Sequence, residues 1–464
     1  MNSSSYDLAV IGGGSAGYAA ARTAVAGGLR TVVIDGSKEL GGLCILRGCM
    51  PTKSLLYATD VLHLVRQAET WGVRTRDVRF DLLRAMARKD ALISEFANYR
   101  RQQLTQGKFE LIRDHARFAD PHTVALSDGR MVVANSFILC TGSVVAPPPL
   151  PQLGQIGYLT SDDALSLDRL PRSLIVLGGG AVAVEFAQVF VRVGVKVPLV
   201  QRCPQLLRDF DADVAAELQK VFQREGMTVF TGTKLLDAWR DAGLKWVSFE
   251  HRGQVERVAA DEILFALGRV PAIANLELDK AGVATDGGRI LTNTEMQTSA
   301  PHIFAAGDCT GPHEIVHIAI QQGEIAAHNL TSPARRRSID YRLLLHVVFT
   351  DPQVAVVGLT EKEAQARQLP CFTARYPFND HGKALIMEAK DGFVKLLADP
   401  ASGEILGGSC VGPSGGELIH EIVAAMHQRM TVHELATMPH YHPTLAEIWT
   451  YPAEELAEKT ASRR

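Results

Sequence analysis

A glycine-rich turn between an apolar run and a helix-forming stretch is the feature that most constrains how this chain can fold. Residues 8–11 are apolar, residues 12–17 read Gly-Gly-Gly-Ser-Ala-Gly, and residues 18–26 are rich in alanine, which favours a helix. A second β-rich run at residues 31–34 ends at Asp35. This order of strand, turn, helix, strand and acid predicts a βαβ unit of the dinucleotide-binding type.

The residue types in this unit suit a pyrophosphate and a ribose. Gly12, Gly14 and Gly17 let the backbone approach phosphate oxygens, and the following helix directs its N-terminal amides and positive dipole end toward them. Asp35, 18 residues after Gly17, is placed to accept a hydrogen bond from a ribose hydroxyl. A glycine-rich turn without any ligand is the alternative that stays open.

The same order returns 166 positions further along the chain. A β-rich run at residues 173–177 precedes a turn that contains Gly178 and Gly180. The residues that follow, 184–192 and then 195–200, favour a helix and a strand. The chain therefore contains two predicted dinucleotide-binding units.

The second unit differs from the first at the third glycine and at the end of its second strand. Ala183 replaces the third glycine, and Gln201 takes the place of an acid, with Arg202 and Arg208 after it. A carboxylate at the strand end would repel a 2′-phosphate, whereas a neutral residue beside guanidinium groups favours one. The sequence therefore predicts a preference for NADPH over NADH, with two solvated surface arginines as the alternative.

Two cysteines lie five positions apart in the first quarter of the chain. Cys44 and Cys49 can close a small disulfide-bonded loop, and Pro51 fits the first turn of a helix. A thiolate near that helix N-terminus, with Arg47 nearby, would have a lowered pKa and act as a nucleophile or electron donor. Two buried structural thiols, or half of a metal site, are the alternatives; no partner Cys/His pair is evident, and we expect no metal.

Residues 440–447 read His-Tyr-His-Pro-Thr-Leu-Ala-Glu. A histidine held by a carboxylate is a common construction for a proton shuttle at neutral pH, so His442 and Glu447 are candidates for an acid/base pair. Taken alone, such a pair is more often structural than catalytic. The acid/base interpretation gains support because a dithiol needs such a group.

Composition limits the class of protein. The 464 residues are 46% hydrophobic and 21% charged, which is typical of a globular chain with several domains. The formal net charge of −3 offers no electrostatic case for nucleic acid or an anionic membrane as a partner. We find no membrane span and no signal peptide at the N-terminus, and seven cysteines are too few for a disulfide scaffold. These features predict a cytoplasmic protein.

Taken together, the motifs resemble the FAD-dependent pyridine nucleotide–disulfide oxidoreductases, a family that includes dihydrolipoamide dehydrogenase, glutathione reductase and mercuric reductase. The resemblance covers essentially the whole chain and is specific, because separate motifs occur in order at compatible spacing. Beyond those above, they are the Gly-Gly-x-Cys-x4-Cys-x-Pro-x-Lys segment ending at Lys53, Thr141-Gly142, Glu185, Gly268-Arg269-x-Pro271, Ala305-Ala306-Gly307-Asp308 and Phe349-Thr350-Asp351-Pro352.

The resemblance implies cofactor-binding roles for these positions. FAD would lie extended across the first domain, contacted by the Thr141-Gly142 motif and with Asp308 near its ribityl–pyrophosphate portion. Lys53 would pair with Glu185 beside the flavin. Gly268 belongs to a further motif of the cofactor-binding part.

The resemblance also implies the redox roles. Cys44 and Cys49 would form a disulfide on one flavin face, opposite the nicotinamide. Cys49 would be the charge-transfer thiol next to the flavin, and Cys44 the interchange thiol that faces substrate. His442, supplied by the other subunit and oriented by Glu447, would be the acid/base, so the functional unit would be a homodimer.

We therefore expect an α/β fold with two Rossmann-like dinucleotide-binding domains, for FAD and for NAD(P), plus a C-terminal α+β dimerisation domain. Proline-rich residues 146–151 indicate a domain crossing, and alternating apolar runs after residue 341 indicate an antiparallel sheet. The expected ranges are 1–150 for FAD binding, 151–270 for NAD(P)H binding, 271–340 for a central segment completing the FAD domain, and 341–464 for the interface domain.

The predicted activity passes electrons from NADPH through FAD and the cysteine pair to a small disulfide substrate. His-Pro-Thr-Leu-Ala-Glu is more similar to the dihydrolipoamide dehydrogenase branch, so an NAD-dependent dihydrolipoamide dehydrogenase is the main alternative. A mercuric-ion or quinone reductase on the same scaffold is a further one, although the chain ends without the cysteine pair typical of mercuric reductases. Leu46 and Arg47 depart from the family's usual redox loop and indicate an unusual or acidic substrate.

Overall fold

The computed structural model describes residues 4–311 and 313–462. It divides into two compact units, the first made of Met1–Pro51, Met86–Pro147 and Gly268–Asp340, the second of Thr52–Ala85, Pro148–Leu267 and Tyr341–Arg464. The predictions about an N-terminal leader and the C-terminal end depend partly on residues 1–3 and 463–464, which lie outside the described residues. In the described part, no helix has both the length and the apolar composition that crossing a bilayer requires.

The first unit is built on a seven-stranded sheet whose centre is parallel. Its order is β3-β2-β1-β6-β5-β4; β5 and β4 join antiparallel, and β18 pairs with the C-terminal part of β6. The strands are β1 (Ser4–Ile11), β2 (Thr31–Ile34), β3 (Glu110–Ile112), β4 (Ala116–Asp120), β5 (Thr123–Leu126), β6 (Met131–Leu139) and β18 (Ile303–Ala305). Because the central strands are buried on both faces, they are continuous apolar runs.

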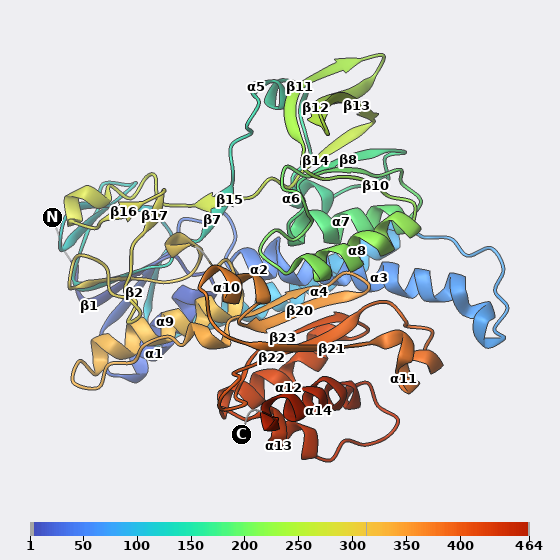
Figure 1. Ribbon diagram of the computed structural model, residues 1–464. Helices are drawn as coiled ribbons and strands as arrows, with labels where there is room; N and C mark the ends of the chain where they lie inside the picture. Colours follow the sequence, from blue (N-terminus) through green and yellow to red (C-terminus); the bar gives the residue numbers. More distant parts are fainter. Residues whose placement is uncertain (1–3, 312, 463–464) are drawn as a thin grey trace. The chain divides into compact units, whose positions relative to one another are not determined.

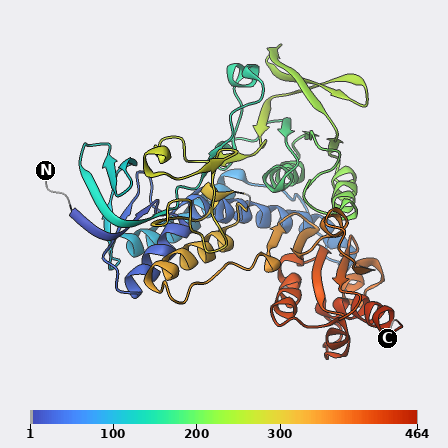
Figure 2. The ribbon, with the colours of Figure 1, turned by 60° about the vertical axis from the view of Figure 1, so that its left-hand side comes forward.

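Two helices of the first unit, α1 (Ser15–Ala26) and α9 (Val316–Thr331), lie side by side in both ribbon views (Figures 1 and 2). Small residues allow this close approach: a Cβ on Gly323 would lie 2.3 Å from the carbonyl oxygen of Ala16. The alanine-rich stretch after the first glycine turn therefore forms the predicted helix and packs through its small side chains.

The remaining elements of the first unit are short, apart from two helices that it shares with the second. Helix α3 (Cys49–Gln67) begins in the first unit and continues in the second, whereas α4 (Leu82–Thr105) begins in the second and continues in the first. The short elements are α2 (Leu43–Leu46), β7 (Ser143–Val145), β15 (Arg269–Pro271), β16 (Thr285–Asp286) and β17 (Arg289–Ile290).

The second unit contains a parallel sheet of order β10-β9-β8-β14 with helices, which carries the second glycine turn. A three-stranded antiparallel sheet, β11-β12-β13, is inserted before β14. The elements are α5 (Pro151–Ile156), α6 (Ser161–Ala164), β8 (Leu174–Leu177), α7 (Ala181–Arg192), β9 (Pro198–Val200), α8 (Ala212–Arg224), β10 (Thr228–Phe230), β11 (Lys234–Asp241), β12 (Leu244–His251), β13 (Gln254–Ala260) and β14 (Glu262–Phe265).

The C-terminal part of the second unit is a five-stranded antiparallel sheet of order β19-β20-β23-β22-β21 with helices packed on it. Trp449 and Phe378 are fully buried in its core. The elements are β19 (Leu345–Val348), β20 (Gln353–Gly358), α10 (Glu361–Ala366), β21 (Phe372–Pro377), α11 (Gly382–Ile386), β22 (Phe393–Ala398), β23 (Ile405–Gly412), α12 (Gly415–His427), α13 (Val432–Thr437) and α14 (Thr450–Ala461).

The predicted fold class is confirmed. Two sheets with parallel strands each contain a glycine turn, and an antiparallel α+β part follows them in the chain. The four predicted domain ranges stay predictions. Two strands are shorter than the sequence predicts, because residues 298–308 read as a strand ending in a Gly-Asp turn and residues 195–200 as a strand. Residues 298–303 form a turn, in which Ile303 N–H donates to Ala300 and Thr298 N–H to Ile303, so only β18 is extended. Val195 N–H donates to Phe190 at the end of α7, so β9 begins at Pro198.

Candidate active site

The first glycine turn brings the chain within contact distance of the neighbouring backbone. Gly12 has a φ of +101°, and a Cβ there would lie 2.3 Å from the carbonyl oxygen of Cys140. A Cβ on Gly17 would lie 1.8 Å from the carbonyl oxygen of Gly12, so α1 can approach the strand end only without a side chain. These two glycines are therefore required by the backbone itself.

Asp35 lies beneath this turn at the end of β2. Its carboxylate accepts hydrogen bonds from the amide of Gly13 at 2.7 Å and from the amide of Ser37 at 2.8 Å. The carboxylate is buried and fixes the turn in place. Its predicted bond to a ribose hydroxyl stays a prediction.

The surroundings of the first turn fit the pyrophosphate of FAD. Helix α1 starts after Gly14 with no side-chain cap, so its first amides have no side-chain acceptor. A Cβ on Gly42 would lie 2.9 Å from the Cα of Gly14, which leaves the turn lined by bare backbone. In the described part of the chain, the buried hydroxyl of Thr141 forms no hydrogen bond of good geometry, and Gly142 follows it with a φ of +71°. Orphan donors and a bare backbone are what a phosphate group requires.

Asp308 follows the strand β18 and belongs to a small polar network. Its carboxylate accepts a hydrogen bond from the Ser143 hydroxyl at 2.7 Å, and the guanidinium of Arg269 donates to that hydroxyl and to the Ser143 carbonyl. Burial, with Asp308 nearby, raises the pKa of Glu314. Gly268 precedes Arg269 with a φ of +118°, and its carbonyl accepts from the amide of Ala146. Gly268 and Asp308, two of the predicted cofactor-binding residues, thus both accept hydrogen bonds from residues in or directly after β7.

The redox loop folds back on itself between its cysteines. Cys44 lies in α2, Cys49 is the first residue of α3, and both are half-buried. A Cβ on Gly48 would lie 3.3 Å from the Cα of Cys44, so the chain before Cys49 packs on the backbone at Cys44. Pro51 lies in the first turn of α3, where proline is well accommodated. The disulfide itself stays a prediction.

Sequence inspection missed a second arginine near this loop. The guanidinium carbon of Arg100, in α4, lies 4.2 Å from the centre of the Tyr18 ring. Burial lowers the pKa of Arg100, while Tyr18 and Cys44 act in the opposite direction. In the described residues its Nε has no hydrogen-bond partner. Only the fold brings α4 to this loop, so no local pattern could have indicated Arg100.

The second glycine turn repeats the backbone of the first. Gly178 has a φ of +121°, and a Cβ there would lie 2.2 Å from the carbonyl oxygen of Ala266. Helix α7 starts after Gly180, again without a side-chain cap. Gln201 is buried beneath the turn, since a Cβ on Gly179 would lie 2.8 Å from its side-chain amide.

The two arginines that follow Gln201 differ in their surroundings. Arg202 is exposed. The Nε of Arg208 donates to the carboxylate of Asp209 at 3.1 Å, and this pairing raises the pKa of Arg208. A role for either residue in holding a 2′-phosphate stays a prediction.

Lys53 and Glu185 form an ion pair in the second unit. The ammonium of Lys53 lies 2.8 Å from one oxygen of the buried Glu185 carboxylate and 3.0 Å from the other. It also lies 4.7 Å from the centre of the Phe349 ring, and the amide of Phe349 donates to Glu185 at 2.9 Å. The role of this pair beside a flavin stays a prediction.

Two turns further along α7, Arg192 is the centre of a charged cluster that the sequence did not reveal. Its guanidinium nitrogens lie 2.7 Å from carboxylate oxygens of Asp60, Glu225 and Asp351. Arg192 is almost completely buried. Three acids from separate parts of the chain thus meet one cation at the C-terminal end of α7.

The two histidines of the His-Tyr-His segment have different environments. The His440 side chain is 7% exposed, and its Nε2 lies 2.6 Å from Glu421. The His442 side chain is 77% exposed, and its Nδ1 lies 3.0 Å from the nearer oxygen of Glu447, which is largely buried. The structure therefore places His442 and Glu447 in contact, with the outer edge of the imidazole open to solvent.

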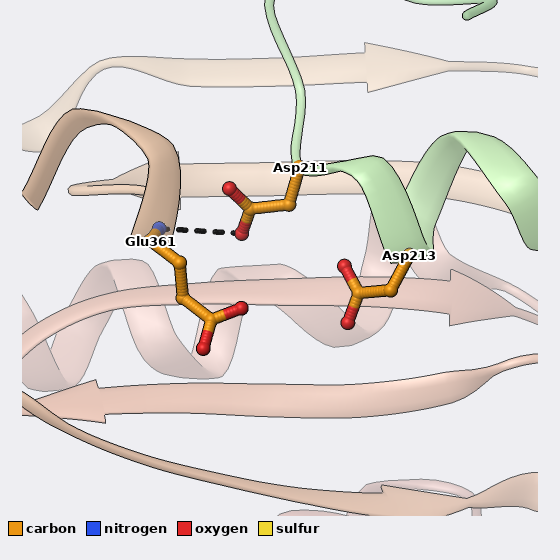
Figure 3. Close-up of side chains that lie close together, drawn as sticks. All are labelled: Asp211, Asp213 and Glu361. Atoms are coloured by element: carbon orange, nitrogen blue, oxygen red, sulfur yellow. Dashed lines mark hydrogen bonds between the residues drawn. The ribbon is translucent and has the colours of Figure 1, made fainter. Parts of the chain in front are cut away.

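The second unit also contains three clustered carboxylates, from Asp211, Asp213 and Glu361 (Figure 3). Their ligand atoms lie within 4.8 Å of one another, and the Glu361 amide donates to Asp211. The ammonium of the buried Lys395 lies 2.8 Å from Asp211, 2.9 Å from Asp213 and 2.7 Å from Glu361. The cationic position is therefore taken by a side chain, and the cluster joins α8, α10 and β22.

Two glycine-turn units, a cysteine pair at a helix start and a His–Glu pair define a nucleotide-linked redox enzyme. The family model described as pyridine nucleotide-disulphide oxidoreductase matches residues 6–323, and the model for the dimerisation domain of the same family matches residues 345–453. The chain belongs to the pyridine nucleotide-disulphide oxidoreductase family.

Individual relatives agree with this assignment. A dihydrolipoyl dehydrogenase of Thermus scotoductus is 36% identical over 433 residues, with 92% of each chain covered. A mercuric reductase of Staphylococcus aureus is 32% identical, covering 92% of this chain and 78% of the relative. Among solved structures, LpdA from Mycobacterium tuberculosis has a TM-score of 0.86 at 29% identity and covers 97% of this chain and 99% of the other. The flavoprotein disulfide reductase RclA from Escherichia coli, in a Cu(II) complex, has a TM-score of 0.86 at 26% identity, with coverage of 98% and 100%.

The predicted family and enzyme class are thereby confirmed. The protein is a flavin-dependent disulfide oxidoreductase similar to dihydrolipoamide dehydrogenase, with FAD as its cofactor and an NAD(P) nucleotide as its partner. The matched dimerisation domain supports a homodimer.

Proposed function

We propose that the enzyme reduces a small-molecule disulfide at the expense of NADPH, through Cys44 and Cys49, with His442 as the acid/base. The observation that carries this proposal is the pair formed by His442 and Glu447. A solvent-exposed imidazole held through Nδ1 by a largely buried carboxylate is suited to proton transfer at its other nitrogen.

The protein groups divide the chemistry among them. Bound FAD supplies the electron relay between the nicotinamide and the two sulfurs. Cys44 as a thiolate attacks one sulfur of the substrate disulfide, and His442 gives its proton to the thiolate that leaves. Cys49 then attacks Cys44 in the mixed disulfide and releases the second thiol. One NADPH and one proton thus convert one disulfide into two thiols.

Local electrostatics favour both thiolates. Cys49 is the first residue of α3, where the helix N-terminus stabilises negative charge. Arg100 interacts electrostatically with Cys44 and supplies positive charge on its side of the loop. A second copy of the chain would supply His442, as the family implies. Apolar side chains are exposed in the dimerisation segment, including Leu385, Ile386 and Tyr441, which supports such pairing.

The proposed preference for NADPH depends on the end of β9. Gln201 carries no charge, and Arg202 is exposed beside it, so a 2′-phosphate would meet a cation and no carboxylate. We also propose a cytoplasmic site of action and no nucleic-acid partner. Seven cysteines in 464 residues and a net charge of −3 support these two proposals.

Stepwise reduction of the purified flavoprotein tests the proposal. We expect a long-wavelength thiolate–flavin charge-transfer band in the wild type and in Cys44→Ser, and no such band in Cys49→Ser. We expect His442→Gln to slow disulfide reduction by roughly 100-fold, since general acid catalysis contributes 10²–10⁴-fold. A band that survives in Cys49→Ser would overturn the assignment.

A second candidate is an NAD-dependent dihydrolipoamide dehydrogenase. The His-Pro-Thr-Leu-Ala-Glu segment and the 36% identity to a dihydrolipoyl dehydrogenase favour it. Comparing kcat/KM for NADPH and NADH, with oxidised lipoamide, glutathione disulfide and Hg(II) as acceptors, separates the candidates. A clear NADH preference with lipoamide would favour the second, and turnover of Hg(II) that survives Cys44→Ser would favour a metal-ion reductase.

A further inference from the structure

A third residue, His381, lies behind the pair formed by His442 and Glu447. It directly precedes α11, and its side chain is fully buried. Its amide donates to the carbonyl of Phe378, and its carbonyl accepts from the amide of Leu385. The ring meets Phe378 and Tyr451 edge to face, with centroids 6.4 and 6.3 Å away. Backbone and packing therefore hold the imidazole in one place.

One ring nitrogen of His381 faces a carboxylate. Nε2 lies 3.4 Å from Oε1 of Glu447, and the same oxygen lies 3.1 Å from Nδ1 of His442. Within residues 4–311 and 313–462, neither nitrogen of His381 forms a hydrogen bond of good geometry. A buried polar group without a partner costs about 1–3 kcal/mol. A small shift of either side chain would complete a bond from His381 to Glu447.

Burial favours a neutral ring. Burial lowers the pKa of His381; Glu447 raises it, and His442 lowers it further. On the opposite side, Tyr451 stacks on Tyr376 at 4.0 Å, and the Tyr376 hydroxyl donates to Asp380. Burial raises the pKa of Tyr376 to about 12, so it stays neutral. A neutral imidazole has one N–H, and the carboxylate of Glu447 is the acceptor that it faces.

We propose that His381 is a positioning residue, which donates a hydrogen bond from Nε2 to Glu447 and thereby holds that carboxylate against His442. This inference rests on the proposed role of His442. The carboxylate would have one imidazole on each side, and a fixed carboxylate keeps the proton of His442 on Nδ1 and its Nε2 free for the substrate thiol.

The test separates the two half-reactions of the holoenzyme. His442 acts only in thiol exchange, so His381→Phe should slow reoxidation by a disulfide substrate by roughly 10-fold. Reduction by NADPH should stay within about twofold. His381→Gln retains a donor and should recover most of the lost rate. Leu435→Ala, in the same hydrophobic core, is the packing control: it should lower Tm without slowing reoxidation selectively.

A second measurement does not depend on activity. The NMR signal of the Nδ1–H proton of His442 can be observed in holoenzyme with isotope-labelled histidine and is assigned by its absence in His442→Gln. This signal should move upfield or disappear in His381→Phe. It should persist in His381→Gln. His381→Met provides the same comparison should the phenylalanine variant yield no holoenzyme. An unchanged Nδ1–H signal and reoxidation rate in His381→Phe, or equal losses in the Phe and Gln variants, would overturn the inference. Should His442→Gln leave reoxidation intact, the proposed function fails, and the Nδ1–H signal still decides the role of His381.

Discussion

The two glycine turns of this protein have nearly the same backbone but differ in the residues that surround it. In each, the first glycine has a positive φ and lies against a neighbouring carbonyl, that of Cys140 in one turn and Ala266 in the other. Gly12 N–H donates to the end of β2, and Gly178 N–H donates to the end of β9. The glycines therefore account for the shared backbone. We expect the residues that differ between the two turns to determine which nucleotide each turn binds.

The differences lie at the third glycine and at the strand end. A methyl group added at Gly17 would overlap the Gly12 carbonyl. In the second turn the methyl group of Ala183 is already present, and it lies 3.5 Å from the position that a Cβ on Gly178 would take, which is an ordinary contact distance. Asp35 accepts a hydrogen bond from its turn at 2.7 Å, whereas the side-chain amide of Gln201 donates to the carbonyl of Gln205 at 3.4 Å. The first turn is thus packed too tightly for a methyl group at its third glycine, and a charged carboxylate lies beneath it. The second turn accommodates a methyl group, and the side chain beneath it is uncharged.

The helices that follow the turns also pack differently. Helix α1 packs on α9 through small residues such as Gly323. Helix α7 buries apolar side chains and adds polar contacts, from Glu185 to Phe349, from Gln188 to Asp351, and from Arg192 to its three carboxylates. Charged packing of this kind depends on pH, and small-residue packing does not.

Exchanging the third residues of the two turns should have the largest effect. We expect Gly17→Ala to yield little folded flavoprotein, because the methyl would overlap backbone atoms that cannot move away. The matched change Ala183→Gly should cost only about 1 kcal/mol and retain nucleotide binding. Bound FAD per chain and Tm measure both. Full flavin content in Gly17→Ala would show that the first turn is no tighter than the second.

The charged packing of α7 can be broken at its centre. Arg192→Met should lower the free energy of unfolding by about 3 kcal/mol, since three carboxylates would lose a buried partner. Denaturant unfolding measures this. Arg172, which is 89% exposed and pairs with Asp261, provides the control. Arg172→Met should change stability by less than about 1 kcal/mol, and equal losses in the two variants would contradict the distinction.

The strand-end difference can be tested by making the second turn resemble the first. Gln201→Glu places a carboxylate at the position equivalent to Asp35, and we expect the ratio of kcat/KM for NADPH to that for NADH to fall by roughly 10- to 100-fold. Arg208→Ala should change the ratio less, because Arg208 already pairs with Asp209. A ratio unaffected by Gln201→Glu would remove this position from nucleotide selection.

The smallest expected effect is the pH dependence introduced by Asp60. Burial raises the pKa of Asp60 to about 6, with Asp351 and Glu225 adding to the rise and Arg192 opposing it. The ordinary value in an unfolded chain is about 3.9. Between these values the folded protein keeps a proton that the unfolded chain has lost. Asp60 therefore makes stability fall as the pH rises from about 4 to about 6, and adds no dependence above that range.

Unfolding at pH 4.5 and pH 7 in the wild type and in Asp60→Asn measures this contribution. The Asp60 side chain is 37% exposed, so solvent screening limits the difference to about 1 kcal/mol. The exposed Asp128 pairs with Arg130 at the surface, and Asp128→Asn is the control. A pH dependence that is identical in Asp60→Asn would contradict the role of burial here.

Much of the fold could be predicted because its signals are local. A few consecutive residues are enough to recognise each of these signals: glycines that need a positive φ, apolar runs that are buried on two faces, and an alanine-rich stretch. The errors were local as well: the strand predicted before β18 is a turn around Ala300, and β9 loses its start to the end of α7. In both places backbone amides donate to carbonyls nearby in the chain instead of to a neighbouring strand, and the sequence pattern does not indicate such bonds.

The candidate site was only partly visible in the sequence. Residues of known motifs, such as Cys44, Cys49, His442 and Glu447, stand out in the amino-acid sequence because each motif contains both members of its pair. Arg100 beside Cys44 and His381 behind Glu447 do not stand out, because neither belongs to a motif that contains its partner.

The sequence by itself determined the two glycine-turn units, the motif that contains Cys44 and Cys49, and the family, because these depend on backbone conformation and residue type within short segments. Apart from the Lys53–Glu185 and His442–Glu447 pairs, which the resemblance implied, only the tertiary structure decided which charges meet. Arg192 contacts acids more than 30, 130 and 150 positions away, and Glu447 contacts a histidine 66 positions before it. Such contacts depend on the path of the whole chain in space, and no run of neighbouring residues encodes that path.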